Sequence, residues 1–538
     1  MENAFPSATF TSPDQVTFLP DGRFLVTEVG GRVWTILANG TQVSTPFLDI
    51  RPEVAGFSDL GMLGTAIDPD FAQADSMKHW VYFGYTVDPN GDDIDNDPDH
   101  FVRVVRYRAS TANPNIADTS TRQVLIGATW TDGILTAHTS HSIGALRFAP
   151  DKTLLIACGE GAHHEVPSDS GGLDPGAFGV GKTDPSEDMG AFRARSLNCL
   201  GGKILRVDKE TGLGVSSNPW WDGNAASHRS RVWLYGFRNP YRWCFRPGTG
   251  STNPASGNPG TIYIGDVGMN TFEEMNVAPT GALNFGWPCY EGGPAQPDYQ
   301  LVTNTHTGNL NPLCGATSNS ENPLAQSITA PKIWWHHFDS AQSSQPGWGI
   351  GSCVIGGTFY EGTSYPAAYQ DRYFIADLYG NWIRKIDVDA NNNVTGWSEF
   401  ITNAGGPVDI EAQPSTGDLF YIAYFPQQVK RIRHTGAVAA PLVAESVTQL
   451  AAQTAPNPFR EGTLIQFSLP DARDAAVAVF DVRGRLVRRL ASTHFTAGSH
   501  VVEWDGRDDA GVRVPRGTYF YRVDTGRGAV SGKVVSIG

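Results

Sequence analysis

The segment Val16–Glu28 reads VTFLPDGRFLVTE, in which two apolar runs flank a Pro-Asp-Gly turn. Such β-branched and aromatic runs around these turn residues are typical of a two-stranded β-hairpin. Related patterns recur at Thr65–Thr86, Leu146–Glu160, Cys244–Gly268, Gly357–Val388 and Val408–Tyr424. Neighbouring turns are in places about 50 residues apart, the length of one four-stranded propeller blade. The sequence therefore predicts an all-β fold with a six-bladed β-propeller over residues 1–435. A pair of β-sandwiches is the alternative that gives strands at this density.

The composition agrees with many short strands. The chain has 538 residues, 60 Gly, 35 Pro and only 18% charged residues, so long helices are not expected. Its formal net charge is −15, and without clustered Lys and Arg a nucleic-acid partner is excluded. No run of about 18 apolar residues occurs, so no membrane span is predicted.

A composition shift near residue 440 indicates a second domain. Residues 440–538 contain 12 Lys and Arg and 10 Asp and Glu, a net of +2, which leaves −17 for the first 439. Residues 436–454 are rich in small side chains and are expected to form a linker. Residues 455–538 are expected to form a small β-sandwich, with strands in Thr463–Pro470, Ala475–Leu490, Ser499–Gly506 and Gly517–Thr525.

Two loops of the propeller contain candidate catalytic residues. His138 and His141 precede a predicted strand, where a histidine can act as a base near neutral pH. Arg238 and Asn239 precede a proline, and an adjacent cation and amide suit an anionic or carbonyl-bearing ligand. A hydrogen-bonded loop histidine and a structural salt bridge are the alternatives.

Two acidic loops are candidate Ca²⁺ sites, because Ca²⁺ takes oxygen ligands. One contains Asp266, Glu273 and Glu274, and the other is Asp88–His100. Neither has the spacing of an EF-hand, and an exposed, solvated loop is the alternative for the second.

Two of the six cysteines indicate the compartment. Cys289 and Cys314 bracket a polar loop, and no CxxC spacing occurs, which favours a disulfide in an oxidising compartment over a metal site. The N-terminal MENAFPSATF lacks the basic and apolar regions of a secretion signal. Either the protein is cytosolic or the signal is absent from this chain.

Seven segments in order resemble the soluble pyrroloquinoline-quinone-dependent glucose and aldose-sugar dehydrogenase family, whose relatives include Hedgehog-interacting-protein-like proteins. They are FLPDGRFLVTE, LGMLGTAIDPDF, HSIGALRFAPD, GGKILRVD, YGFRNPYR, IYIGDVG followed by EEMN, and NFGWPCYEG. The resemblance covers most of residues 10–435. It implies a six-bladed propeller with the quinone over the channel mouth, a sugar or related alcohol as substrate and an external electron acceptor.

The resemblance also implies residue roles. His141 would be the base that takes the proton of the sugar hydroxyl as hydride moves to the quinone. Arg238 would stabilise negative charge on the quinone carbonyl, and Asn239 would contact the cofactor. Gly268 and Met269 would hold Ca²⁺ through their main-chain carbonyls.

The family's cationic cofactor contacts are replaced here. Tyr379 stands at the cofactor-binding position of a family lysine, and Gly406 and Val408 stand where the family has two arginines. Without these cations a tricarboxylate loses several charge-assisted hydrogen bonds, each worth about 1.5–3 kcal/mol. Arg384 and Lys385 lie nearby in sequence, and they and the loop Lys332–Trp348 are candidate substitutes, although the sequence does not show that either replaces these cations.

The last domain resembles the immunoglobulin-like domain of flagellar-hook-capping type. The residues that show this are APNPF, FSLP, VFDVRGRLVRRL, WDGRDDAG and GTYFYRV. The resemblance implies cell-surface sorting or secretion machinery as a partner and an extracytoplasmic, secreted or cell-surface protein. A purely structural appendage is the alternative. With oxidised Cys289–Cys314, a second candidate pair is Cys158–Cys199.

Three functions are compatible with these observations. The first is a secreted Ca²⁺- and quinone-dependent oxidoreductase acting on sugars or related alcohols. The second is a non-catalytic propeller that binds a glycan or a protein, with an aromatic groove expected around Trp334, Trp335 and Trp348. The third is a Ca²⁺-dependent lactonase, which requires carboxylates gathered at the channel mouth.

Overall fold

The computed structural model describes most of the chain. The described residues are 1–57, 59–72, 74–89, 100–162, 187, 189–300, 303–304, 309–312, 314, 327–434, 450–455, 457, 459, 462–495 and 498–537. The chain divides near Gly436 into two compact units.

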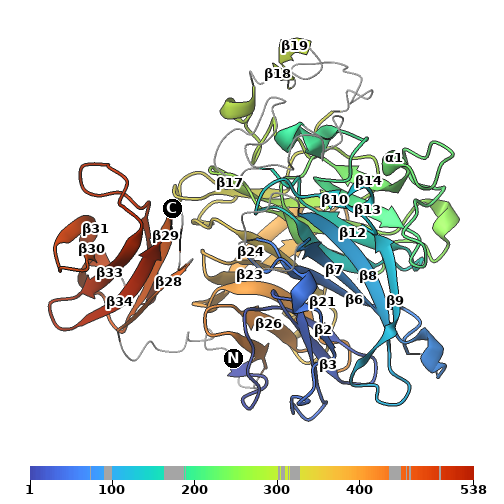
Figure 1. Ribbon diagram of the computed structural model, residues 1–538, viewed down its shortest axis with the longest axis horizontal. Coiled ribbons are helices and arrows are strands. Elements are labelled where there is room, and N and C mark those ends of the chain that lie inside the picture. The colour runs from blue at the N-terminus through green and yellow to red at the C-terminus, as the bar shows by residue number, and fades with distance from the viewer. Residues whose placement is uncertain are drawn as a thin grey trace. The chain divides into compact units, whose positions relative to one another are not determined.

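Six antiparallel sheets of four or five strands form most of the first unit (Figure 1). The first strands of the sheets are β2 (Pro13–Phe18), β6 (Met62–Ile67), β11 (Ile143–Phe148), β15 (Pro240–Phe245), β21 (Val354–Tyr360) and β25 (Pro407–Ala412). The second strands are β3 (Phe24–Glu28), β7 (Trp80–Val87), β12 (Leu154–Cys158), β16 (Ile262–Asp266), β22 (Arg372–Asp377) and β26 (Leu419–Ala423). Each of these twelve strands overlaps one of the six predicted hairpin segments, so the predicted repeat is confirmed.

Further strands complete the sheets. The third strands are β4 (Arg32–Ile36), β8 (Phe101–Ala109), β13 (Lys203–Val207), β17 (Phe272–Ala278), β23 (Trp382–Val388) and β27 (Gln428–Ile432). The outer strands are β5 (Leu48–Asp49), β10 (Ile134–Leu135), β14 (Val232–Tyr235), β20 (Ile333–His336), β24 (Val394–Thr402) and β1 (Glu2–Asn3). β9 (Ala117–Ile126) also pairs with β8, and β18 (Thr303–Asn304) pairs with β19 (Asn309–Pro312).

Helices are short in the described part of the chain. The one α-helix there is α1 (His228–Arg231). The 3₁₀ turns are η1 (Arg51–Glu53), η2 (Ser76–Lys78), η3 (Trp130–Asp132), η4 (Gly190–Arg195), η5 (Pro254–Ser256), η6 (Pro297–Tyr299) and η7 (Ala367–Tyr369). None of the described helices is long and apolar enough to cross a membrane.

The sheets are arranged as the blades of a propeller. The first strands contact one another in the closed order β2, β6, β11, β15, β21, β25 and back to β2, so they surround a central channel. β1, at the start of the chain, pairs with β27 near the end of the unit and completes the sixth blade. Apolar side chains fill the space between blades; Leu25 and Val33 of the first blade, for example, pack with Phe83 of the second. The fold is therefore a six-bladed β-propeller.

Strand register places one set of loops at one end of the channel. In every blade the first residue of the inner strand pairs with a residue at or near the end of the second strand, as in Ile143 with Cys158 and Pro240 with Asp266. The other four blades follow the same register. The residues before the inner strands and those after the second strands therefore gather at the same end, which we call the mouth.

Arg242 connects four inner strands inside the channel. Its side chain is 1% exposed and donates hydrogen bonds to the Leu63 carbonyl of β6 and to Asp14 of β2. It also forms a 3.3 Å ion pair with Asp409 of β25. Burial raises the pKa of Asp409 to about 7 even though Arg242 lies beside it. The channel below the mouth is thus filled by an ion-pair network that joins distant blades.

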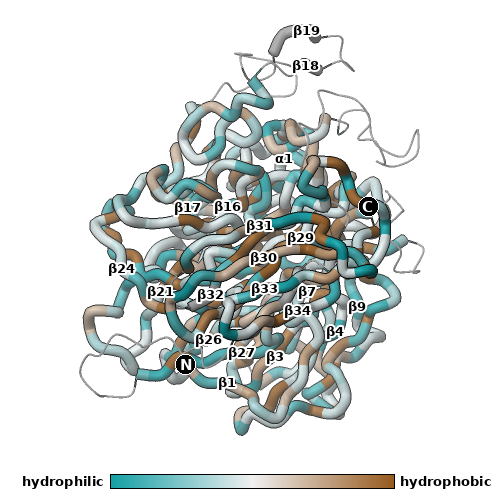
Figure 2. The backbone as a smooth tube through the Cα atoms, turned by 90° about the vertical axis from the view of Figure 1, so that its left-hand side faces the viewer, coloured by the Kyte–Doolittle hydropathy of each residue, from teal (hydrophilic) through white to brown (hydrophobic). Residues whose placement is uncertain are grey.

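The second unit is an immunoglobulin-like β-sandwich. One sheet has the order β28 (Ala451–Ala455), β29 (Thr463–Leu469), β32 (Gly498–Trp504). The other has the order β31 (Leu486–Phe495), β30 (Arg473–Asp481), β33 (Gly517–Asp524), β34 (Ala529–Ser536). Figure 2 shows hydrophobic residues along β29 and β30, whose buried side chains pack around Trp504. β28 begins inside the expected linker because it pairs with β29.

One expected disulfide forms and the other does not. Cys289 and Cys314 are bonded, with Cα atoms 5.4 Å apart. Cys158 and Cys199 are free thiols, so the prediction that they pair is wrong. Each donates instead to a main-chain carbonyl, Cys158 to Leu200 and Cys199 to Arg193.

Replacement of Arg242 by Met is expected to lower the free energy of unfolding of the propeller by about 3–5 kcal/mol, because it leaves Asp14 and Asp409 buried without their cation. Chemical denaturation followed by tryptophan fluorescence measures the change. Arg51→Met is the matched control, since Arg51 pairs with Asp49 at the exposed surface and such pairs contribute about 0–1 kcal/mol. Equal midpoints for the two variants would contradict the account of the channel.

Candidate functional site

His141 lies at the mouth, two residues before β11. Its side chain is 2% exposed, and its backbone has the left-handed φ of 55°. Its Nδ1 is 3.0 Å from Oε1 of Glu160, which follows β12 and is fully buried. Gly159 permits this approach, since a Cβ there would stand 2.3 Å from the His141 carbonyl oxygen. The hairpin of the third blade thus builds a histidine–carboxylate pair.

Burial changes the pH at which the Glu160 carboxyl group ionises. Desolvation raises the pKa of its carboxyl group to about 8, while the charges of Arg238 and Arg193 act in the opposite direction. Arg193, from η4, donates to the carbonyls of Glu160 and Gly161. Because a carboxylate partner fixes which ring nitrogen of a histidine has the proton, the ionisation of Glu160 decides which form His141 takes.

Arg238 and Asn239 enter the mouth from the loop before β15. Their backbone N–H groups donate to the two oxygens of Asp266, at 3.1 and 2.7 Å. The Arg238 guanidinium donates to the carbonyls of Val267 and Gly268, at 3.2 and 2.6 Å, and lies over the ring of Trp287. The Glu160 backbone N–H donates to the Arg238 carbonyl. The structure therefore brings the predicted residues Arg238, Asn239 and Gly268 close to the His141–Glu160 pair.

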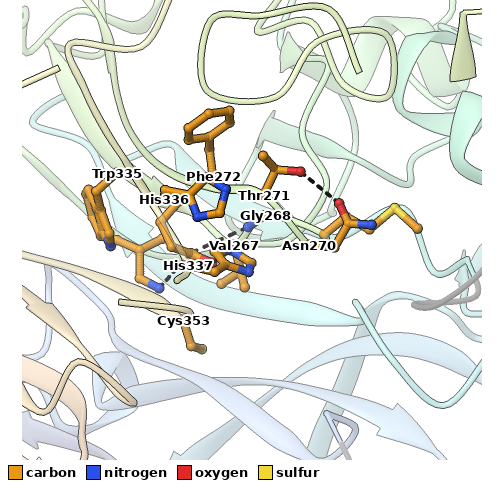
Figure 3. A network of polar contacts seen from close by, with 12 residues as sticks. Val267, Gly268, Asn270, Thr271, Phe272, Trp335, His336, His337 and Cys353 are labelled. Carbon is orange, nitrogen blue, oxygen red and sulfur yellow. Dashed lines mark hydrogen bonds and ion pairs between the residues drawn. The ribbon is translucent and has the colours of Figure 1, made fainter. Parts of the chain in front are cut away.

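Gly268 and Met269 belong to a turn held by buried carboxylates. Glu291 accepts the N–H groups of Met269, Thr271 and Phe272. Figure 3 shows Gly268 with His337 and Cys353. In this network Glu273 accepts the N–H groups of Gly268 and Val354 and forms a 2.7 Å ion pair with His337.

The oxygen atoms of this turn that could bind Ca²⁺ already accept hydrogen bonds from protein groups. Asp266, Glu273 and Glu274 all bond to protein groups, and the Gly268 carbonyl accepts from a guanidinium. In the described part of the chain no group of three or more His, Cys, Asp or Glu side chains is arranged to hold a metal ion. The Gly268 carbonyl, which Ca²⁺ would need, therefore already accepts a hydrogen bond from the positively charged Arg238. Of the second acidic loop, residues 90–99 lie outside the described residues.

Tyr379, Gly406 and Val408 place neutral groups where a tricarboxylate needs cations. Tyr379 follows β22, and desolvation raises the pKa of its hydroxyl group. Gly406 has a φ of 71°, and a Cβ there would meet the ring of Phe425. Val408 is a buried residue of β25.

The expected substitute cations are occupied elsewhere. Arg384 lies among the rings of Trp348, Trp382 and Trp397 and pairs with Glu399. Lys385 pairs with Asp387, and Lys332 bonds to Asn393. Arg384 and Lys385 are therefore engaged in contacts other than those with a cofactor. The described residues fit the proton-accepting and carbonyl-facing parts of a quinone site, but not the binding of three carboxylates.

The expected aromatic groove is absent at two of its three positions. Trp335 and Trp348 are fully buried, and their rings pack against each other with centroids 5.3 Å apart. They form part of the apolar core between the fourth and fifth blades, so they do not offer a glycan-binding surface.

Sequence reasoning missed two residues of the mouth. Glu160 is the last residue of the predicted hairpin segment Leu146–Glu160, whose first strand starts after His141, so the register of that hairpin was the available signal. Asp59 precedes Gly61 and β6 in the segment DLGMLG. Nothing in that segment distinguishes Asp59 from a solvated loop residue.

Comparisons with known proteins agree with this architecture. HIPL1 protein of Arabidopsis thaliana is 27% identical over 414 residues, which is 70% of this chain and 51% of the relative. The chain spans about half the length of the curated relatives it matches first. A glucose dehydrogenase crystal structure is similar with a TM-score of 0.54 and 20% identity, over 79% of this chain and 98% of that chain.

A second solved structure is the PQQ-bound form of aldose sugar dehydrogenase from Streptomyces coelicolor. It has a TM-score of 0.51 and 19% identity, over 80% of this chain and 96% of that chain. At such identities the likeness shows the fold alone.

Two family models match the two units. Residues 456–529 match the FlgD Ig-like domain. Residues 10–424 match the model described as Glucose / Sorbosone dehydrogenase. With a six-bladed propeller and a histidine–carboxylate pair at its mouth, the chain belongs to the glucose/sorbosone dehydrogenase family.

Proposed function

We propose that the mouth binds a sugar or related polyol and that His141 takes the proton from one of its hydroxyl groups during oxidation. The observation that supports this most is the 3.0 Å contact between the buried His141 Nδ1 and Glu160 Oε1. When Glu160 is ionised, Nδ1–H donates to it and Nε2 has a lone pair. That nitrogen is then the base.

Protonation of Glu160 reverses this arrangement. The carboxyl group then donates its proton to Nδ1, and the imidazole proton lies on Nε2, where it cannot accept another. Since burial raises the pKa of Glu160 to about 8, the basic form of His141 increases as the pH rises through about 8.

Arg238 supplies positive charge beside this pair. Arg238 is 5% exposed, and a cation in a desolvated site stabilises negative charge that develops during reaction. We assign Arg238 this role toward the group that accepts the hydride, and Asn239 a contact to the same group.

Oxidation of a hydroxyl group also needs an acceptor for two electrons. Pyrroloquinoline quinone, with Ca²⁺ at Gly268 and Met269, is the acceptor that the resemblance implies. Since Tyr379, Gly406 and Val408 offer its carboxylates no cation, no step is assigned to it here.

A non-catalytic glycan- or protein-binding propeller is the second candidate. The same three neutral positions favour it, because they weaken the site for the family's cofactor. A lactonase has less support, since no cluster of three or more metal-ligating side chains occurs in the part of the chain that is described.

We also propose an extracytoplasmic location, with the FlgD-like domain serving secretion or surface attachment. The Cys289–Cys314 disulfide supports it, because disulfides persist in oxidising compartments.

The rate of sugar oxidation, measured with a panel of quinone and dye acceptors, is expected to rise with pH with an apparent pKa of about 8. His141→Ala should lower kcat about 10²–10⁴-fold. Glu160→Gln should remove the pH dependence near 8. His494→Ala, at an exposed histidine of the second unit, is the control and should leave the rate unchanged. Rates and pH profiles that are the same in His141→Ala, Glu160→Gln and the parent protein would contradict the assignment of His141 as the base.

Calorimetric titration with pyrroloquinoline quinone in the presence of Ca²⁺ is expected to show no saturation at tens of micromolar. Tyr379→Lys should strengthen binding at least about tenfold by adding one charge-assisted hydrogen bond, while Tyr379→Phe should not. Tight binding to the unaltered protein would overturn the argument from missing cations.

A further inference from the structure

Arg193 of η4 contacts the main chain beside the His141–Glu160 pair. Its side chain is 1% exposed. Its Nε donates to the Glu160 carbonyl at 2.7 Å, and its Nη2 donates to the Gly161 carbonyl at 3.0 Å. The rigid, forked guanidinium suits two acceptors that lie side by side. One buried side chain therefore bonds two consecutive main-chain carbonyls, beginning with that of Glu160 itself.

The N–H groups of the same two residues bond to other residues of the mouth. The Glu160 N–H donates to the Arg238 carbonyl, and the Gly161 N–H donates to the His141 carbonyl. Together with the two bonds from Arg193, these contacts satisfy every main-chain polar group of Glu160 and Gly161. The Glu160 side chain thus extends from a segment of main chain that is fixed at each polar atom.

η4 is held in turn by Lys203, the first residue of β13. Lys203 is fully buried, and its Nζ donates to the carbonyls of Arg193, Ala194 and Gly201 at 2.6, 3.0 and 2.6 Å. These bonds use the three donors of an ammonium group. Gly202 allows η4 to lie this close, since a Cβ there would stand 2.5 Å from the Ala194 Cα. Arg193 is therefore fixed at its backbone as well as at its guanidinium.

Charged groups from four elements face the Glu160 carboxyl group. His141 comes from the loop before β11, Arg238 from the loop before β15 and Arg193 from η4. Asp266, at the end of β16, is the acidic neighbour, and the charge of Glu160 contributes to its raised pKa. Burial raises the pKa of Glu160, and the charges of Arg238 and Arg193 act in the opposite direction. Arg193 thus provides a nearby positive charge in addition to its bonds to the main chain.

We infer that Arg193 is a positioning residue for the His141–Glu160 pair, whose guanidinium fixes the main chain of Glu160 so that the carboxylate stays within hydrogen-bond distance of His141 Nδ1. Lys203 supports this role by fixing the backbone of η4. The inference rests on the proposed role of His141 as the base and adds the residue that holds its carboxylate partner. Since a nearby cation favours the ionised form of a carboxyl group, loss of Arg193 should raise the pKa of Glu160 and shift the basic form of His141 to higher pH.

Nitrogen NMR of the full chain labelled with ¹⁵N-histidine tests this through the pH at which the His141 tautomer changes. In the parent protein the change is expected near pH 8, because burial raises the pKa of Glu160 to about 8. Arg193→Gln removes the charge and should raise this midpoint by about one pH unit or more. Arg193→Lys keeps the charge and should keep the midpoint close to that of the parent. Arg195→Gln is the matched control and should leave the midpoint unchanged, because Arg195 also lies on η4 but donates to Cys289 Sγ.

A second measurement uses the parent protein labelled with ¹⁵N-arginine and does not depend on whether Arg193→Gln folds. The Nε–H signal of Arg193, assigned as the one that Arg193→Lys lacks, should exchange slowly with solvent because it is buried and hydrogen-bonded. It should also shift with the same pH midpoint as His141. A signal that exchanges rapidly, or that does not shift with His141, would overturn the inference.

The outcomes separate this inference from the proposed function. A parent tautomer change near pH 8 with an equal or lower midpoint in Arg193→Gln would overturn the positioning role of Arg193 and leave His141 as the base. A parent protein whose His141 tautomer does not change between pH 6 and 10 would contradict the proposed base and this inference with it.

Discussion

One buried guanidinium joins four of the six inner strands across the channel. Arg242 of β15 reaches β2, β6 and β25 through Asp14, the Leu63 carbonyl and Asp409. These contacts cross the channel, whereas the strand pairing within each blade does not. Because a buried charge without its partner is strongly unfavourable, this network sets how the blades stand around the axis. The arrangement of the blades also positions the residues of the mouth, since each of them lies on a loop that begins or ends at a strand of one blade.

The chemistry of the mouth follows from burial as much as from residue type. His141 and Glu160 are adjacent because two strands of one hairpin meet, and Gly159 allows their close approach. Desolvation then changes what the pair can do, since it keeps Glu160 protonated to a higher pH than an exposed glutamate. A site with a base and one guanidinium that already donates to the Val267 and Gly268 carbonyls suits a neutral polyol better than a tricarboxylate.

The sequence predicted local structure well and cross-blade contacts poorly. The hairpin at Val16–Glu28 and its relatives could be recognised, because turn residues and alternating runs lie within one short segment. Cys289 and Cys314 could be paired because they bracket a single polar loop. The pairing of β1 with β27 and the contact of Arg242 with Asp14, 228 residues apart, depend on ring closure and have no local signal. For the same reason the sequence did not show that three tryptophans enclose Arg384. Nor did it show that the thiols of Cys158 and Cys199 bond to main-chain carbonyls and not to each other.

The central claim is that ionised Glu160 holds the proton of His141 on Nδ1 and leaves Nε2 as the base. Nitrogen NMR of protein labelled with ¹⁵N-histidine, with His141→Gln used to assign the signals, tests it directly. The account predicts a neutral imidazole with its proton on Nδ1 above about pH 8 and a change of tautomer as Glu160 becomes protonated below that pH. A proton that stays on Nε2 up to pH 9 would contradict the account.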